Sequence, residues 1–231
     1  IRKISDIPVT NILVDEQTDF RSLNIPQDVT LIVVKDARYA MAICASNFYD
    51  NPSRKFKLIG VTGTKGKTTT AYFADHILAQ STANHIALFS TLDRILGNKP
   101  EDKFKSDLTT PESLDLFHDM RAAVDNGMTH LVMEVSSQAY KKNRIYGLKY
   151  DVGIFLNISP DHIGRNEHPT FADYLHCKEQ LLVNSAKCLI NAETEKFTDV
   201  YYTAKATTQP EDIFLFARRG ANIELPDNAQ I

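Results

Sequence analysis

Short apolar runs alternate with helical patterns along the chain from about residue 56 onward. The runs are almost continuously apolar, which is typical of strands that a parallel sheet buries on both faces. Their alternation with helices predicts an α/β domain whose mostly parallel sheet is flanked by helices and joined by right-handed crossovers. Ligands of such domains bind at the carboxyl ends of the strands. The expected strands are Phe56–Val61, His85–Ser90, Thr129–Val135, Asp151–Asn157, Lys187–Asn191 and Asp212–Ala217.

Three helices are expected between these strands. The first follows Lys67. The second opens at Thr110–Pro111, with the proline at its first position, and stops near Gly127. The third spans Phe171–Val183 and has Thr170 as its N-cap.

The first 55 residues follow a different pattern. Val29–Val34 is expected to form a strand and Ala37–Tyr49 a helix, and Asp50–Ser53 has the composition of a linker. We therefore expect a partial N-terminal domain, residues 1–51, and a central domain, residues 52–231.

The charge balance gives no support for a polyanionic partner. The 231 residues include 26 basic and 29 acidic ones, a formal net charge of −3, so we expect neither a nucleic acid nor a membrane as partner. No run reaches the ~18 consecutive apolar residues of a membrane span, and no signal-peptide run follows Ile1–Asp6. Cys44, Cys177 and Cys188 show no CxxC spacing, which favours a reduced, cytoplasmic setting and disfavours metal–thiolate chemistry.

A glycine-rich segment, Gly63–Thr69, joins the first expected strand to the first expected helix. Its glycines permit a close backbone approach, so that N–H groups at the helix N-terminus face a phosphate. Lys67 can then reach the β- and γ-phosphates, and the Thr68 hydroxyl can ligate Mg²⁺. Val61 occupies the place of the first glycine in the full GxxxxGK[ST] pattern. The alternative is a Gly/Lys turn that precedes a helix by chance. The strand before the segment and the helix after it are, however, the context that a nucleoside triphosphate site requires, and we expect the triphosphate to be ATP.

Two further polar side chains follow expected strands. Glu134 stands at the end of Thr129–Val135, where its carboxylate can hold a metal ion beside the phosphate loop. Its alternative role is to cap the helix that follows. His162 follows the next strand and a proline turn, which places it on the ligand face, although a lone histidine is more often structural.

Lys178 interrupts the apolar face of the helix Phe171–Val183. A buried ammonium without a partner is costly, so one interpretation is a lysine whose stem covers the core while its ammonium reaches water. The other is a desolvated lysine that loses its charge and adds CO₂. The resulting carbamate is an anionic oxygen ligand suited to Mg²⁺.

Several separated motifs together resemble the Mur ligases, the ATP-dependent amide-forming enzymes of peptidoglycan synthesis. The motifs are Gly63–Thr69, Thr109–Glu112, Met133–Ser137 and Asn157–His162, followed by Lys178. The similarity runs from about Asp36 to Phe216. Within the family, the order and spacing are most similar to the ligases that add a diamino acid, lysine or diaminopimelate, to UDP-muramoyl-dipeptide. Folylpolyglutamate and cyanophycin synthetases are relatives of the family.

The resemblance implies a role for each matching residue. ATP would be bound by Gly63, Thr64, Lys65, Gly66, Lys67, Thr68, Thr69 and Asn157, and Lys67 and Lys178 would be catalytic. Mg²⁺ would be held by Thr68, Glu134, His162 and Lys178 as its carbamate. UDP-muramoyl-dipeptide would contact Thr109, Thr110, Ser136 and Arg144. Without the resemblance, Arg144 is a solvated charge beside Lys141 and Lys142.

The chain departs from the family pattern in three places. Gln138 stands where the family usually has histidine, and Leu108 where asparagine commonly precedes the Thr-Thr pair. Gly164–His168 is about two residues longer than usual.

Mur ligases have a UDP-binding N-terminal domain, a central ATPase domain and a C-terminal domain that binds the incoming amino acid. The resemblance assigns residues 1–51 to a remnant of the first and residues 52–231 to the second, and no uridine-binding segment is recognisable in Ile1–Ile32. The loop-like composition of Gly220–Ile231 gives no start of a C-terminal domain. We therefore expect a fragment of a monomeric enzyme that acts on small molecules.

The implied reaction activates a carboxylate. The D-glutamyl carboxylate attacks the γ-phosphate of ATP, and the amine of the diamino acid then displaces phosphate from the acyl-phosphate. A folylpolyglutamate synthetase and a nucleotide-binding module without catalysis are the alternatives. The Glu134–Ser137 run and Arg144 favour a diamino-acid ligase, and the complete set of metal ligands disfavours a mere binding module.

Overall fold

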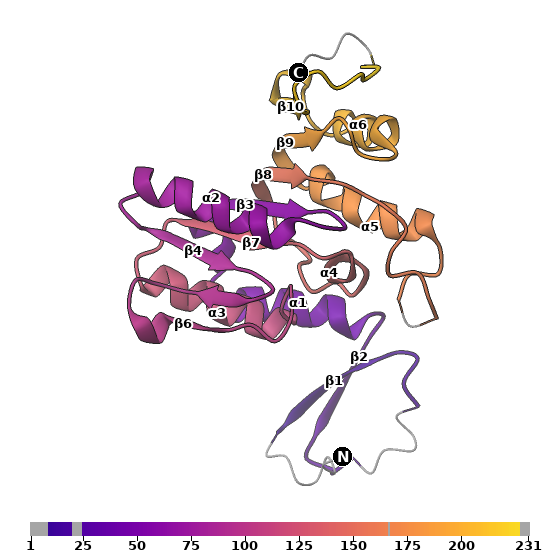
Figure 1. The fold of residues 1–231 in the computed structure, drawn as a ribbon. Coiled ribbons are helices and arrows are strands. Elements are labelled where there is room, and N and C mark those ends of the chain that lie inside the picture. Colours follow the sequence, from indigo (N-terminus) through magenta and orange to yellow (C-terminus); the bar gives the residue numbers. More distant parts are fainter. Residues whose placement is uncertain (1–8, 20–24, 166, 227–231) are drawn as a thin grey trace.

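The computed structural model describes residues 9–19, 25–165 and 167–226 (Figure 1). Eight strands form one sheet in the order β10-β9-β8-β3-β7-β4-β5-β6. The strands from β10 to β4 are all paired in parallel. Strand β5 is paired antiparallel with both of its neighbours, β4 and β6. The predicted α/β fold with a mostly parallel sheet is therefore confirmed. The strands of this sheet are β3 (Lys57–Thr62), β4 (Ile86–Phe89), β5 (Asp93–Ile95), β6 (Lys103–Lys105), β7 (His130–Glu134), β8 (Tyr150–Phe155), β9 (Ser185–Asn191) and β10 (Ile213–Phe216).

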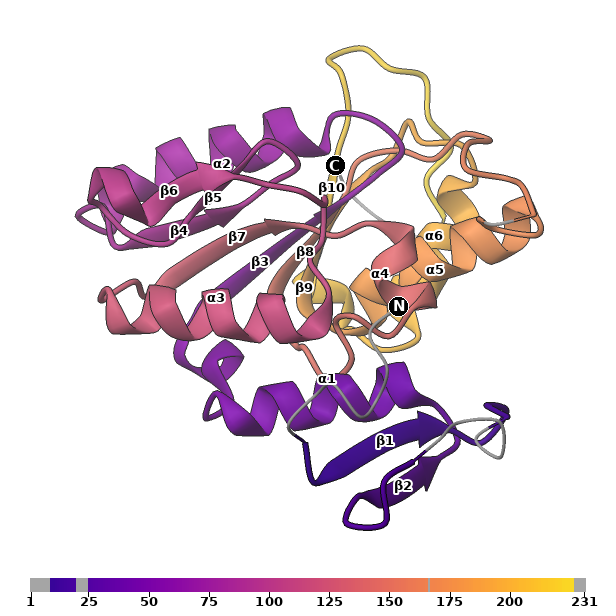
Figure 2. The same ribbon diagram turned by 90° about the horizontal axis from the view of Figure 1, so that it is seen from below.

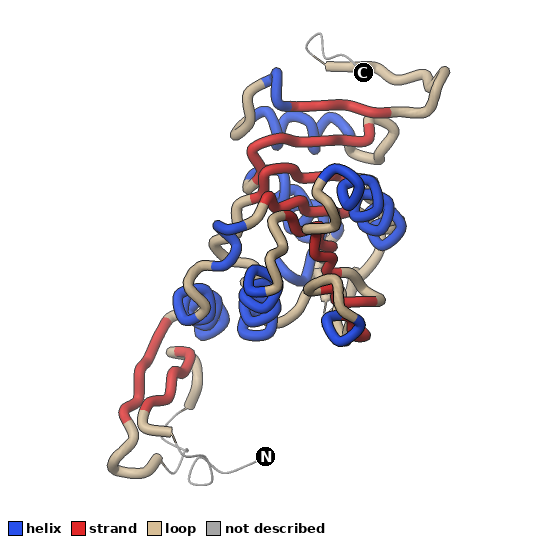
Figure 3. Tube along the Cα trace, turned by 90° about the vertical axis from the view of Figure 1, so that its left-hand side faces the viewer, coloured by secondary structure: helices blue, strands red, loops and turns tan. Residues whose placement is uncertain are grey.

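Helices cover both faces of the sheet. Figure 2 shows α2 on one side of the strands and α3 on the other, with α1 beyond α3, and Figure 3 shows the strands as a column between helices. Alternate residues of β3 serve the two faces: Ile59 and Val61 join the cluster under α2, whereas Leu58 joins the cluster with α3. The helices are α1 (Ala37–Phe48), α2 (Lys67–Ser81), α3 (Ser113–Asp125), α4 (Ser137–Lys141), α5 (Phe171–Val183) and α6 (Phe197–Lys205), with short 3₁₀ turns at Pro52–Lys55, Pro100–Asp102 and Pro210–Asp212.

A separate two-stranded parallel sheet, β1 (Asn11–Asp15) and β2 (Thr30–Val34), projects away from the large sheet in Figure 1. The helix that follows it, α1, packs against α3, and its Ala45 belongs to the main core cluster. The division between residues 51 and 52 stays a prediction. The sequence predictions for residues 1–8 and for the end of Gly220–Ile231 lie outside the described residues.

The expected start of α3 is wrong. Pro111 lies two residues before the helix, and Glu112 is its extended N-cap. The reason is tertiary: the Thr110 hydroxyl donates to the carbonyl at the end of β7, and the Thr110 carbonyl accepts a hydrogen bond from Arg144. These hydrogen bonds hold Thr110 at the sheet, and the helix begins only at Ser113. By contrast, α5 has its predicted bounds, and Thr170 caps it by accepting from the backbone of Asp173 at 3.2 Å.

Among the residues that the structure describes, no helix is both long and apolar enough to cross a membrane. All three cysteines are free, with Cys44 exposed and Cys177 and Cys188 buried.

Gly60 allows α5 to approach β3 closely. A Cβ at Gly60 would lie 2.6 Å from Leu181 Cδ1 and 2.9 Å from the buried Tyr150 ring. We expect Gly60→Ala to lower the free energy of unfolding by about 1–3 kcal/mol, because overpacking pushes α5 from the sheet. Gly164→Ala is the control, since its Cβ would meet nothing closer than 3.9 Å. Urea unfolding measures both, and equal midpoints would contradict the packing argument.

Candidate active site

A cavity of about 280 Å³ lies where β3 and β7 end at their carboxyl ends, beside α4 and α5. Its walls bring together residues that are far apart in the sequence, which is the arrangement that the strand-end rule predicts. Seven predicted site residues line it: Lys67, Thr109, Thr110, Ser136, Arg144, His162 and Lys178. Glu134 lies fully buried at the end of β7, and the other predicted residues belong to the phosphate loop or its support.

The segment Gly63–Gly66 forms the expected loop between β3 and α2, and Lys67 is the first residue of the helix. Gly66 has φ +85°, a left-handed conformation that favours glycine. A Cβ on Gly63 would lie 3.0 Å from Leu156 Cβ. Thr68 is half-buried and Thr69 is exposed in the first turn of α2. The loop geometry therefore suits close approach of an anion to backbone N–H groups.

Asn157 supports this loop from the end of β8. Its side-chain oxygen accepts from the Lys65 backbone N–H at 2.9 Å, and its amide donates to the Lys65 carbonyl at 3.0 Å. Its backbone carbonyl accepts from Thr64 N at 3.0 Å. The Thr64 hydroxyl donates to the Ser159 carbonyl at 3.3 Å. In this structure Asn157 thus holds the shape of the loop.

Two lysines meet at one carbonyl of the loop. Lys178 Nζ donates to the Gly63 carbonyl at 2.7 Å, and Lys67 Nζ donates to the same oxygen at 2.9 Å and to the Thr64 carbonyl at 3.2 Å. Lys178 is 2% exposed, and its Nζ lies 4.8 Å from the centre of the Tyr174 ring. Burial, together with repulsion from Lys67, lowers the pKa of Lys178 to about 7. Burial also lowers the pKa of Lys67, against the attraction of Glu134 and Asp161.

Lys178 therefore does not reach water as a snorkelling lysine would. Its amine is buried, partnered by a carbonyl and held close to a second cation. Such an environment favours the neutral amine.

Glu134 is fully buried, and both its oxygens accept hydrogen bonds from Thr91. The Thr91 backbone donates at 2.7 Å and the hydroxyl at 3.0 Å. These contacts orient the carboxylate at the end of β7, and Glu134 does not act as the cap of α4, because Ser136 has that role.

His162 stands at the mouth of the cavity with about half of its side chain exposed. Its backbone φ is +53°, which is uncommon for a residue with a Cβ. Its Nδ1 lies 3.0 Å from Glu167 Oε1, and its ring centre lies 6.2 Å from that of Tyr174. The imidazole is therefore on the ligand face, as the sequence predicts.

The predicted substrate residues form one wall. The Thr110 hydroxyl donates to the Glu134 carbonyl and accepts from Ser136 N, both at 3.0 Å. The Thr109 hydroxyl lies 3.0 Å from the Thr91 hydroxyl, to which it can donate because Thr91 donates to Glu134. Thr110 thus ties the metal-binding and substrate-binding parts of the predicted site to each other.

Arg144 is not a solvated charge. It is 8% exposed, its Nη2 lies 2.6 Å from Glu112 Oε1, and its Nη1 donates to the Thr110 carbonyl at 3.2 Å. Arg38 of α1 also pairs with Glu112, at 3.3 Å. The guanidinium is thereby fixed in the cavity wall.

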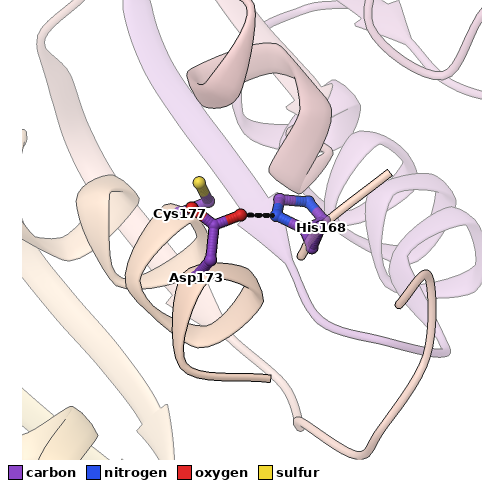
Figure 4. Close-up of side chains that lie close together, drawn as sticks. All are labelled: His168, Asp173 and Cys177. Atoms are coloured by element: carbon purple, nitrogen blue, oxygen red, sulfur yellow. Dashed lines mark hydrogen bonds and ion pairs between the residues drawn. The ribbon is translucent and has the colours of Figure 1, made fainter. Parts of the chain in front are cut away.

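Several residues of the site escaped the sequence prediction. Thr91 follows β4, so the strand-end rule that selected Glu134 could have selected it too. His168 is fully buried, with Nδ1 2.6 Å from Asp173 Oδ2 and Nε2 2.9 Å from Ser137 Oγ. Figure 4 shows its ring facing the Asp173 carboxylate, with Cys177 one turn further along α5. No local pattern signals the bond between His168 and Ser137, because Ser137 lies on α4, 31 residues before His168.

Comparison with known proteins gives a consistent result. The family model of the Mur ligase middle domain matches residues 61–225. The chain is 88% identical over 200 residues to the UDP-N-acetylmuramyl-tripeptide synthetase of Limosilactobacillus reuteri, covering 87% of this chain and 39% of that protein. It is 71% identical over 196 residues to the synthetase of the same name from Ligilactobacillus salivarius, covering 85% of this chain and 38% of that protein. The chain thus spans less than two fifths of the length of these relatives.

Solved structures share the fold. The structure of a UDP-N-acetylmuramoyl-L-alanyl-D-glutamate–2,6-diaminopimelate ligase matches with a TM-score of 0.63 at 21% identity, over 85% of this chain and 38% of that one. A Mycobacterium tuberculosis folylpolyglutamate synthase matches with a TM-score of 0.52 at 16% identity, over 78% of this chain and 46% of that one. The family model covers most of the chain and includes the phosphate loop and every cavity element described above from β3 onward. The chain belongs to the Mur ligase family, whose middle domain it contains.

Proposed function

We propose that the protein is an ATP-dependent ligase that joins a diamino acid, L-lysine or meso-diaminopimelate, to UDP-N-acetylmuramoyl-L-alanyl-D-glutamate in peptidoglycan precursor synthesis. The observation that carries the proposal is the cavity in which Lys67 and Lys178 share the Gly63 carbonyl beside Thr110, Ser136 and Arg144. The 88% identity to a UDP-N-acetylmuramyl-tripeptide synthetase supports the choice of substrate. The proposed substrates are soluble small molecules, which suits an enzyme of the cytoplasm. We propose that it acts as a monomer and binds neither nucleic acid nor membrane.

We assign residues 1–51 to the N-terminal substrate-binding domain and residues 52–231 to the central ATP-binding domain. The assignment is supported by the separate β1–β2 sheet and by the family match that starts at residue 61. Selection between lysine and diaminopimelate then belongs to a C-terminal domain.

ATP is proposed to bind at Gly63–Thr69, with Asn157 holding the loop in shape. Lys67 donates to two loop carbonyls, and a triphosphate would attract its ammonium away from these neutral acceptors because a phosphate oxygen carries a negative charge of its own. Lys67 would then neutralise charge that builds up on the γ-phosphoryl oxygens during transfer.

The residues present fit a Mg²⁺ site. The donor set consists of the Thr68 hydroxyl, the Glu134 carboxylate, the His162 imidazole and Lys178 as its carbamate. Glu134 is a buried carboxylate whose hydrogen-bond donors come only from Thr91 among the described contacts, so it retains lone pairs for a cation. When bound, the ion would neutralise phosphoryl charge.

Lys178 also fits carbamate formation. The amine has the low pKa that makes it nucleophilic toward CO₂ near neutral pH. The carbamate nitrogen keeps one N–H, which can continue to donate to the Gly63 carbonyl. The change replaces an ammonium that repels Lys67 by an anion that attracts it.

The chain's own residues then act on the acceptor. Arg144 and Ser136, with Thr109 and Thr110, would hold UDP-muramoyl-dipeptide so that its D-glutamyl carboxylate meets the γ-phosphate in line. That carboxylate attacks phosphorus and ADP leaves, giving an acyl-phosphate. The amine of the diamino acid attacks the acyl carbon, phosphate leaves, and the amide forms.

A substrate screen with the full-length protein tests this function. We expect ADP release with UDP-muramoyl-dipeptide plus lysine or diaminopimelate, and none above background with a folate plus glutamate. The reverse preference would assign a folylpolyglutamate synthetase. ATP binding without phosphate release on either substrate pair would assign a non-catalytic nucleotide-binding module.

A further inference from the structure

His168 connects three segments of the site. Its backbone N–H donates to the His162 carbonyl, and its own carbonyl accepts from Gly164 N, both at 3.0 Å, which closes the loop that presents His162. Its ring contacts Ser137 Oγ of α4 at 2.9 Å and Asp173 Oδ2 of α5 at 2.6 Å (Figure 4). One buried side chain therefore joins the loop to two helices.

The two helices carry groups that the proposed reaction uses. Ser137 follows Ser136, which caps α4 and lines the cavity, and Lys178 lies on α5. The pair of Lys141 with Asp173, at 2.9 Å, makes a second link between α4 and α5. With only five residues, α4 cannot hold its own conformation, so its position depends on such contacts.

The hydrogen-bond roles along this chain follow from its acceptor. An ionised Asp173 only accepts, so the ring donates to it from Nδ1, and Nε2 forms the hydrogen bond with the Ser137 hydroxyl. Both ring nitrogens are then used, which leaves the imidazole one orientation. A fully buried ring with one orientation is a rigid connection between α4 and α5.

We propose that His168 is a positioning residue that, through Ser137, fixes α4 and its Ser136 against α5 for binding of UDP-muramoyl-dipeptide. This inference rests on the proposed function. It predicts that breaking the bond between His168 and Ser137 weakens the use of the muramoyl substrate and leaves the use of ATP unchanged. Among the described residues, the His168 ring reaches the phosphate loop only through Tyr174, whose ring lies 5.1 Å away and whose hydroxyl lies 3.2 Å from Thr64 Oγ1, and Ser137→Ala leaves these contacts in place.

A metal site is the competing interpretation of the same side chains. Ligand atoms of His168, Asp173 and Cys177 lie within 4.8 Å of one another. However, the Asp173 oxygen already accepts from His168 and pairs with Lys141, whose ammonium repels a cation. The hydrogen-bond connection therefore accounts better for the geometry.

A double-mutant cycle in the full-length protein tests the proposal. Ser137→Ala and His168→Asn remove the same hydrogen bond from its two ends, and the asparagine keeps a donor for Asp173. We expect each variant to raise the KM for UDP-muramoyl-dipeptide about fivefold, the effect of one lost hydrogen bond. The KM for ATP should stay within about twofold. The double variant should be no worse than either single variant, since the two residues act as one unit.

The matched control is His176→Asn, at an exposed histidine of the same helix, which should leave both KM values unchanged. A merely structural role would lower the melting temperature without separating the two KM values, and that result overturns the proposal. Ser137→Ala keeps the buried His168 ring and so tests the proposal even if the His168 variant does not fold.

Zinc that copurifies with the wild type and is lost in Cys177→Ser would also overturn the proposal, in favour of a metal site. A wild type that makes no tripeptide product overturns the proposed function as well, whereas normal KM values in Ser137→Ala overturn this inference alone.

Discussion

Replacing Lys178 by methionine in the full-length protein is expected to lower the rate of ligation by about 10³-fold or more. The methionine side chain is one atom shorter and keeps an apolar stem, but it lacks the nitrogen that donates to the Gly63 carbonyl and that would carry the carbamate. Under the proposed mechanism, the site would then lack one anionic oxygen donor for Mg²⁺ and a partner for Lys67 when phosphoryl charge develops. The measurement is ADP release at saturating substrates, with product identified by mass.

Chemical rescue separates a carbamate from a plain lysine. In Lys178→Ala, which leaves space, a short carboxylate such as acetate should restore part of the activity, whereas it should do nothing for the methionine variant, which fills the space. Lys149→Ala, at an exposed lysine bonded to Asn184, is the control and should remain fully active. Rescue by acetate in neither variant, together with an unmodified Lys178 in active wild type by mass, would contradict the carbamate.

The same lysine should also leave a signature in stability. In CO₂-free buffer, the folded pKa of about 7 lies below the value of 10.5 for a free lysine. Between these pH values the unfolded chain holds a proton that the folded chain has released, so stability should rise with pH across this window. The methionine variant lacks this contribution, and its stability should rise less over the same range. An identical pH dependence of the two proteins would show that Lys178 is not buried as a low-pKa amine.

The sequence was sufficient to predict the parts of the site that follow from strand ends and helix faces. Gly63–Thr69, Glu134 and His162 each follow a buried strand, and parallel strands bring their carboxyl ends to one edge. Lys178 is recognisable because it interrupts an apolar stripe with helical spacing, and its 2% exposure confirms the expected burial. These signals are local in sequence.

What the sequence could not provide are contacts between distant elements. Pro111 was expected to open α3, but Thr110 and Arg144 make tertiary hydrogen bonds that override this local preference. The buried ring of His168 gains its role only when α4 and α5 are side by side. The short strands β5 and β6 carry no apolar run long enough to predict, because each has only three residues.

Replacing Lys67 by alanine is the second change with a large expected effect, about 10³-fold in the rate of ATP turnover and of ligation together. Lys67 donates to the loop carbonyls of both Gly63 and Thr64, so its ammonium already lies at the proposed phosphate-binding loop. Its lowered pKa shows that part of its hydration is already lost, so binding a triphosphate costs it little further desolvation. Its loss removes a positive charge from the position where negative charge grows during transfer.

The two lysines can be told apart by what each variant still binds. Lys67→Ala should weaken binding of ATP itself, measured by calorimetry without Mg²⁺. Lys178→Met should leave metal-free ATP binding within about twofold of wild type, because the proposed role of Lys178 is in the metal site. Lys57→Ala, at the opposite end of β3 and paired with Asp151 at 2.9 Å, is the control for loss of a lysine near this strand. Near-normal ligation by Lys67→Ala would contradict the proposed role of Lys67 and the phosphate loop in phosphoryl transfer. A loss of metal-free ATP binding in Lys178→Met would instead show that ATP binding needs the hydrogen bond from Lys178 to the Gly63 carbonyl.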